Sequence, residues 1–144
     1  AIPDADPDAW YYDAMLWASC TGIMQGYEDG TYRPNRAITR QEMATILLRM
    51  ADAKLGADLV DAALAEIADG GSVASWARAG VAFCYLGGIM NGVGGAHFDP
   101  TGMLTRAQLA QVFFNLYNIG MDQAVHPGED PEPVPEPTPM ALAA

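Results

Sequence analysis

The feature that most constrains the fold is an internal repeat. When the sequence is shifted by 66 residues, segments 10–51 and 76–117 align without a gap. Repeats of this size are usually supersecondary units that cannot bury their apolar face alone, so we expect two such units to share one core. The matched positions include Trp10 and Trp76, Gly22 and Gly88, Met24 and Met90, Gly26 and Gly92, Pro34 and Pro100, and Arg40 and Arg106.

Each unit is predicted to be a helix, a loop and a second helix. The first helix is expected over Ala9–Thr21, with Asp8 as its cap and Gly22 ending it in the left-handed conformation. The second helix has an explicit start signal, because Thr39 and Glu42 form a capping box. The fold class is therefore all-α, with about five helices. The second unit has Thr105 and Gln108 at the equivalent positions, and helical apolar stripes run through Met43, Ile46, Leu47 and Met50 and through Leu109, Val112, Phe113 and Leu116.

Charge and composition exclude several function classes. Seven Lys and Arg against 18 Asp and Glu give a net charge of −11, which argues against general binding to nucleic acid or to an anionic membrane surface. No apolar run approaches the roughly 18 residues of a spanning helix, so no membrane insertion is expected. Because the chain starts at Ala1 without a charged-then-apolar leader, it reads as a mature or excised segment.

The chain divides into three parts. Residues 1–54 form the first repeat, residues 55–120 a connecting helix and the second repeat, and residues 121–144 a linker or tail. Six of the ten prolines lie between Val125 and Pro139, interleaved with acids. Such a segment favours an extended chain that cannot form a core, so we expect it to be disordered.

No catalytic or metal motif stands out. The two cysteines, Cys20 and Cys84, lack the spacing of a zinc site and lie in apolar surroundings, so buried free thiols are favoured over a disulfide. The two histidines are far apart, and no Ser-His-Asp arrangement or phosphate-cradling glycine loop is present. We expect no metal and no cofactor.

Arg40 and Arg106 are the first candidates for ligand binding. Each follows a capping threonine, where a cation opposes the helix dipole. A guanidinium fork at the positive end of a helix could bind a carboxylate or phosphate. The alternative is a structural pairing of each arginine with an acid such as Asp13 or Asp99.

Aromatic and turn residues complete the candidate set. Trp10 and Trp76 open the first helix of each unit, where they could pack in the core or form a flat wall for a sugar ring. The glycines are first of all turn residues, and they would also let a ligand approach the backbone. The candidate turn residues are Gly26, Asp29, Gly30 and Gly92.

The spaced pattern of these residues resembles the S-layer homology (SLH) motif. The first copy covers it almost from end to end, and the second is similar to the divergent repeat often found last in an SLH array. Together they cover about residues 1–118. The first copy carries the resemblance through Ile2, Asp4, Trp10, Tyr11, Tyr12, Gly22–Tyr27, Asp29, Gly30, Pro34 and Thr39–Ala44, and the second through Ile67, Asp69, Trp76, Gly88–Gly92, Phe98, Pro100 and Thr105–Gln108.

The resemblance implies a non-covalent cell-wall anchor. SLH modules bind secondary cell-wall polysaccharide, in many cases through a terminal pyruvate-ketal sugar, and three repeats typically form a pseudo-threefold trefoil. This chain would then be a partial trefoil-like bundle, extracellular, at a bacterial cell wall or S-layer. By this resemblance Arg40 and Arg106 would be anion anchors, Trp10 and Trp76 groove walls, and Gly26, Asp29, Gly30 and Gly92 groove or turn residues.

Two departures from the family pattern keep other functions open. Only two repeats are present, and the second loop has Gly94–His97 where the first has Glu28–Thr31, with Asp99 in place of Arg33. The alternative function is an assembly module, whose repeats pair with a third repeat or with another chain in a homo-oligomer without binding glycan. An enzyme is the weakest option, because no pair of carboxylates stands out.

Overall fold

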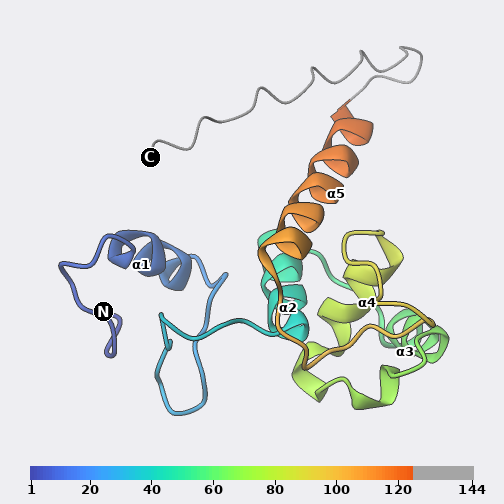
Figure 1. Cartoon of the computed structure of the whole chain (residues 1–144), viewed down its shortest axis with the longest axis horizontal. Coiled ribbons are helices and arrows are strands. Elements are labelled where there is room, and N and C mark those ends of the chain that lie inside the picture. The colour runs from blue at the N-terminus through green and yellow to red at the C-terminus, as the bar shows by residue number, and fades with distance from the viewer. Residues whose placement is uncertain (125–144) are drawn as a thin grey trace.

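The computed structural model describes residues 1–124, in which helices joined by loops are the regular secondary structure (Figure 1). The predicted all-α class is confirmed. The prediction for the proline-rich tail lies outside the described residues, although residues 121–124, expected in the tail, continue the last helix. In the described part the elements are α1 (Tyr12–Cys20), α2 (Arg40–Met50), α3 (Ala57–Glu66), two short 3-10 turns η1 (Gly70–Ser72) and η2 (Ser75–Ala77), α4 (Arg78–Leu86) and α5 (Arg106–Ala124).

The second helix of each repeat begins at the predicted capping threonine. At α5 the box is reciprocal, because Gln108 N donates to the Thr105 hydroxyl and Thr105 N donates to the Gln108 side chain. At α2 the Thr39 hydroxyl accepts from Glu42 N, but it also donates to the Glu42 carboxylate at 2.9 Å. The Glu42 carboxylate therefore accepts from the hydroxyl of Thr39, and not from the backbone N–H of Thr39 as in a reciprocal capping box.

The start of the first helix differs from the prediction. α1 begins at Tyr12, and no side chain caps it. Asp8 was the expected cap, but its own N–H donates to the Asp6 carboxylate at 3.0 Å in a turn before the helix. The end of the helix is as predicted, since Gly22 has a φ of 76° and can adopt it without the steric cost that other residues meet.

The core lies around α2, α3 and α4. Among the described residues α4 lies close against both α2 and α3, whereas the backbones of α1 and α5 lie close to no other helix, and α5 reaches the core through the side chain of Val112. Gly80 permits the close α2–α4 contact, because a Cβ there would lie 2.8 Å from backbone atoms of Ala44. Figure 1 accordingly shows α1 and the loop after it standing apart from the other helices. The core includes Ala44, Leu47, Val60, Leu64, Ile67, Val81, Cys84, Met90, Phe98 and Val112.

Asp4 fixes the first loop to the segment that precedes α1. Its two carboxylate oxygens accept hydrogen bonds from consecutive amides, Tyr32 N at 2.9 Å and Arg33 N at 2.8 Å. The amide of Tyr32 is the main cause that lowers the pKa of Asp4 below its ordinary value. A single side chain thus closes a segment of nearly thirty residues.

Asp69 does the same in the second repeat. Its oxygens accept from Phe98 N at 2.7 Å and Asp99 N at 2.8 Å, which lie 66 residues after the amides held by Asp4. In both repeats the second of these residues has a left-handed backbone, with φ of 49° at Arg33 and 57° at Asp99. This conformation is uncommon outside glycine, and the carboxylate clamp holds it in place.

Both cysteines are free thiols, but only one is buried. Cys84 lies in the core, where desolvation raises the pKa of its thiol to about 12. Cys20 is exposed at the end of α1, so the expectation that it is buried is wrong. The apolar residues around it in the sequence belong to a helix that packs against no other helix of residues 1–124.

Candidate ligand-binding site

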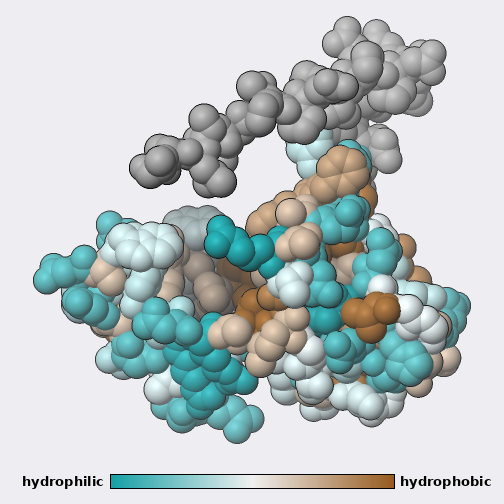
Figure 2. Space-filling view, viewed as in Figure 1, coloured by the Kyte–Doolittle hydropathy of each residue, from teal (hydrophilic) through white to brown (hydrophobic). Residues whose placement is uncertain are grey.

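A cavity of about 940 Å³ lies beside the first loop. Its walls come from the start of α1, from residues 24–38, from one face of α2 and from Trp76 of the second repeat. In Figure 2 hydrophilic residues cover much of this N-terminal part, and hydrophobic ones appear where it meets the other helices. The site therefore joins an aromatic and apolar surface to a rim of charges.

Aromatic rings form much of the cavity wall. Trp10 is 94% exposed and Trp76 is 55% exposed, so neither is a core residue. Tyr11, Tyr27 and Tyr32 line the same cavity. Exposed indole and phenol rings give flat apolar faces with polar edges, a combination suited to sugar rings.

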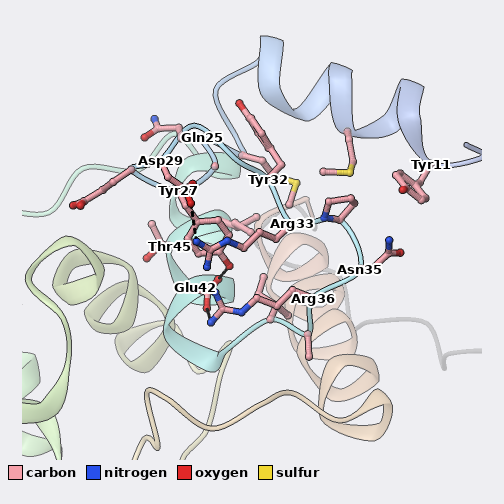
Figure 3. Close-up of a pocket in the computed structure, with 18 of the residues that line it drawn as sticks. Tyr11, Gln25, Tyr27, Asp29, Tyr32, Arg33, Asn35, Arg36, Glu42 and Thr45 are labelled. Carbon is pink, nitrogen blue, oxygen red and sulfur yellow. Dashed lines mark hydrogen bonds and ion pairs between the residues drawn. The ribbon is translucent and has the colours of Figure 1, made fainter. Parts of the chain in front are cut away.

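Tyr27 organises the charged side of the cavity. Its hydroxyl donates to the Glu42 carboxylate at 2.6 Å, and the guanidinium carbon of Arg33 lies 4.1 Å from its ring centre. The guanidinium of Arg36 lies near the same ring, at 5.1 Å, and 3.9 Å from Glu42. Figure 3 shows both arginines beside Tyr27 and Glu42. Desolvation, followed by the bond to Glu42, raises the pKa of Tyr27 and keeps it protonated.

Asp29 lies at the tip of the first loop and holds Arg33. It accepts from the Thr31 hydroxyl at 2.6 Å, from Thr31 N at 3.0 Å and from Arg33 at 2.9 Å. These bonds, led by the Thr31 hydroxyl, lower the pKa of Asp29 to about 2. Because the Arg33 and Asp29 side chains are 42% and 53% exposed, their ion pair is weak and can give way to another anion.

Arg49 is the cation of this cavity that lacks a carboxylate. It lines the cavity from α2 and is half-buried, and desolvation lowers its pKa below the ordinary arginine value. Within residues 1–124 no ion pair involves Arg49, whereas Arg33 and Arg36 each have one. A partly desolvated guanidinium of this kind attracts an anionic group. Three of the seven basic residues of this acidic chain thus line one cavity.

Arg40 faces the interior of the protein instead of the cavity, contrary to the expectation for a ligand anchor. It is 3% exposed, its Nε donates to the carbonyl of Phe98 at 2.7 Å, and its Nη2 donates to the carbonyl of Asn91 at 2.7 Å. The expected structural alternative, an ion pair with Asp99, is not formed either. Desolvation lowers the pKa of Arg40, and Asp99 and Asp69 act in the opposite direction from a distance. In this structure Arg40 joins the two repeats.

The other predicted residues divide between the cavity and the second repeat. Gly26 and Asp29 line the cavity, and Gly30 is the next residue of the same loop. Gly26 also allows the two ends of the first loop to lie close together, because a Cβ at this position would be 2.8 Å from the carbonyl oxygen of Thr31. Gly92 has the equivalent position in the second loop, where a Cβ would meet the carbonyl of His97, and it does not line the cavity. Arg106 is exposed at the start of α5 and does not line the cavity.

Sequence reasoning missed Arg33, Arg36 and Arg49 as functional candidates. A signal was present, because Arg33 and Arg36 flank Pro34 in a turn-rich loop and neither repeats in the second unit, where Asp99 and Gly102 occupy these positions. Residues that differ between two copies of a repeat point to a role that only one copy has. The half-buried position of Arg49 depends on how α2 meets the loop, which no local pattern reveals.

Two classes of site are not found in the part that the structure describes. No group of three or more His, Cys, Asp or Glu residues within residues 1–124 is placed to hold a metal ion. Over the same residues, no helix has both the length and the apolar character that crossing a bilayer requires.

The fold is an all-α tandem repeat with an aromatic and arginine-lined cavity between its parts. Comparison with known protein families matches residues 1–44 and residues 66–110 to the S-layer homology domain. The chain belongs to the SLH family, with two tandem repeats, as the sequence resemblance implied. Family membership makes it an extracellular, cell-surface module associated with the cell wall.

Three relatives illustrate the range of proteins that carry similar modules. The chain is 32% identical over 113 residues to the "Surface-layer 125 kDa protein" of Lysinibacillus sphaericus. This alignment covers 76% of this chain and 9% of the relative. It is 34% identical over 108 residues to "Exoglucanase XynX" of Acetivibrio thermocellus, with 74% and 10% covered, and 26% identical over 118 residues to "S-layer protein sap" of Bacillus anthracis, with 82% and 14% covered. The chain thus spans between 9% and 14% of the length of these relatives, one of which is named as an enzyme.

Proposed function

We propose that this chain anchors a surface protein by binding an acidic sugar of the secondary cell-wall polysaccharide in the cavity beside the first loop. The observation that carries the proposal is the clustering of Arg33, Arg36 and Arg49 with Trp10 and Trp76 around one opening. A pyruvate ketal presents both a carboxylate and an apolar ring face. The arginines meet the first requirement and the indoles the second.

The binding mechanism follows from the charges on the rim. Arg33 and Arg36 are held near Tyr27 by their ion pairs, Arg33 with exposed Asp29 and Arg36 with the partly buried Glu42. A ligand carboxylate would compete for these guanidinium groups and would pair with Arg49 without displacing a protein anion. Their ordered starting positions reduce the entropy lost on binding.

Equilibrium binding, and no chemical turnover, is the proposed activity of this module. A glycosidase needs one carboxylic acid with a raised pKa to protonate the leaving group. At this cavity the pKa of Asp29 is about 2, so that group stays ionised, and Glu42 accepts hydrogen bonds from Tyr27 and Thr39. The exoglucanase name of one relative belongs to a protein about ten times longer than the matched segment.

Sedimentation with purified cell walls tests the proposal. The full chain is expected to bind native walls and to lose binding to walls stripped of the secondary polymer, or to walls whose carboxyl groups have been reduced. Arg49→Ala, and Arg33→Ala with Arg36→Ala, should each weaken binding about ten-fold or more, since truncating a charge-assisted bond costs about 1.5–3 kcal/mol.

Arg78→Ala is the matched control. Arg78 pairs with Asp61 at 2.7 Å, outside the cavity lining, so its removal changes the net charge by the same single unit as Arg49→Ala without touching the site. Equal binding to carboxyl-reduced walls would show that no acidic group is recognised. Equal loss in the control and in Arg49→Ala would show that only net charge matters.

A further inference from the structure

The joint between the two repeats is a set of backbone and guanidinium hydrogen bonds. Four donors at the start of α2 bond to four carbonyls of the second loop. They hold the second repeat against the first, together with the burial of one face of α2. The pairs are Arg40 Nε to Phe98 O, Arg40 Nη2 to Asn91 O, Arg40 N to Gly102 O and Gln41 N to Pro100 O, at 2.7, 2.7, 2.9 and 2.9 Å.

Because of the 66-residue repeat, the chain has a second set of the donors and a second set of the carbonyl acceptors of this joint. Neither set is hydrogen-bonded within the described residues. Arg106 and Ala107 at the start of α5 correspond to the two donor residues. Within residues 1–124 neither the Arg106 guanidinium nor these two backbone N–H groups are bonded, and the four corresponding carbonyls of the first loop accept no hydrogen bond. Those carbonyls belong to Gln25, Tyr32, Pro34 and Arg36.

The buried face of α2 is also repeated as an exposed face of α5. Five residues of α2 are buried in the joint, and all five equivalents on α5 are exposed. Phe113, the equivalent of buried Leu47, is 55% exposed. The equivalents are Arg40 and Arg106, Gln41 and Ala107, Ala44 and Ala110, Thr45 and Gln111, and Leu47 and Phe113.

The matching half of the joint is α1. In the second repeat α4 packs on α2, and α1 is the first repeat's equivalent of α4. Trp17 of α1 is 61% exposed, whereas its equivalent Phe83 is partly buried against the core. Within residues 1–124, α1 and α5 are not in contact with each other. The described part of the chain therefore carries two complementary halves of an interface that are not joined to each other.

We propose that two copies of this chain associate head to tail, with α5 of one copy docked on α1 and the first loop of the other. The partner is a second copy because the same sequence supplies the open donors and the open acceptors, in the register that the internal joint already uses. Such heterologous contacts form a closed ring or a chain of molecules. Arg106 would then donate to the first-loop carbonyls of its neighbour.

Two substitutions between the repeats set the strength of this contact. Ala14 replaces Gly80, so its Cβ keeps the helices slightly further apart, and Ala107 replaces Gln41, whose side chain accepts from Ala74 N at 3.0 Å. The contact between copies is thus weaker than the internal joint and depends on concentration. All four acceptor residues also line the cavity, which places the interface beside the glycan site.

Sedimentation equilibrium of the full chain in 0.15 M salt, from micromolar to millimolar concentration, tests the association. The expected mass rises above the 15.3 kDa of one chain as concentration increases. Arg106→Ala and Phe113→Glu on α5, and Trp17→Glu on α1, should each weaken association about ten-fold or more. Leu59→Glu on the exposed side of α3 and Arg78→Ala are the controls, and melting curves verify that every variant folds.

Mixing two variants gives the sharpest result. A chain with Phe113→Glu keeps an intact α1 surface, which can still bind α5 of another copy. A chain with Trp17→Glu keeps an intact α5 surface, which can still bind α1 of another copy. Each alone should remain a monomer, while the mixture should form one-to-one pairs of about twice 15.3 kDa and nothing larger. A monomeric parent at millimolar concentration, or a mixture that stays monomeric, overturns the proposal and leaves the two faces to a third repeat elsewhere in the polypeptide.

Discussion

The Nε atom of Arg40 lies 2.7 Å from the carbonyl oxygen of Phe98, which follows it by 58 residues. This bond lies in the interior and spans the two repeats. Arg106, the residue of the second repeat that corresponds to Arg40, has no such acceptor among residues 1–124. Two arginines at identical motif positions therefore have different environments, and their substitutions should have different effects.

Arg40→Ala is expected to destabilise the fold by about 3 kcal/mol, because it removes two charge-assisted bonds and leaves the buried carbonyl of Phe98 without its donor. Thermal unfolding followed by circular dichroism should show a fall in Tm of about 10 °C or more. Arg106→Ala, measured at a concentration where the chain is monomeric, should leave Tm within about 2 °C, since exposed substitutions are usually small in effect. Equal shifts in the two variants would contradict the assignment of Arg40 as the joint between repeats.

Gly80→Ala should cost about 1–3 kcal/mol of stability. The new methyl group would lie 2.8 Å from backbone atoms of Ala44, so α2 and α4 would have to move apart. Gly56→Ala is the matched control, because a Cβ at that position meets no atom within 4 Å. Chemical denaturation of both variants gives the comparison, and an unchanged midpoint for Gly80→Ala would rule out the tight helix contact.

Asp69→Asn is expected to lower stability by about 1.5–3 kcal/mol at neutral pH, because an amide oxygen replaces a carboxylate that accepts two backbone bonds. Burial raises the pKa of Asp69, but the amides of Phe98 and Asp99 outweigh it, so the pKa lies below the ordinary 3.8. The stabilisation is therefore complete above pH 3.8 and is lost as pH falls through the lowered value. Unfolding measured from pH 7 to pH 2 should show the parent converging on the variant only in acid, while Asp61→Asn tracks the parent.

Trp10→Ala and Trp76→Ala are each expected to weaken binding to native walls several-fold with little change in Tm. Both indoles are exposed and line the cavity, so they contribute little packing to the core. Leu59→Ala is the control for loss of an exposed apolar side chain, because Leu59 lies on α3 and lines neither the cavity nor the proposed contact between copies. Wall binding that survives the loss of both cavity tryptophans would remove the sugar-stacking part of the proposal.

Thiol labelling at pH 8 should count one reactive cysteine in the native chain and two in denaturant. Cys20 is exposed, whereas Cys84 is buried with a thiol pKa of about 12 and stays protonated. Mass spectrometry of the labelled native protein should place the modification on Cys20. Rapid native labelling of Cys84 would mean that the α2–α4 core opens readily.

The sequence predicted the elements of the fold better than it predicted the site. The capping threonines, Gly22 and the helical stripes act locally, so their effects can be read over a few residues. Arg40 shows where that reasoning fails, because its motif position looks like an anion anchor, and only the arrangement of the second loop reveals its carbonyl partners. The cavity arginines were missed for the same reason, since α2 and the first loop meet through contacts distant in the sequence.

The carboxylate clamps of Asp4 and Asp69 have a consequence for the order of folding. Each closes a segment of about thirty residues within its own repeat, whereas the Arg40 bond to Phe98 joins residues 58 apart. Shorter closures lose less chain entropy. Each unit can therefore set its loop before it meets its neighbour, so the first repeat can organise its loop while the second repeat is still unfolded.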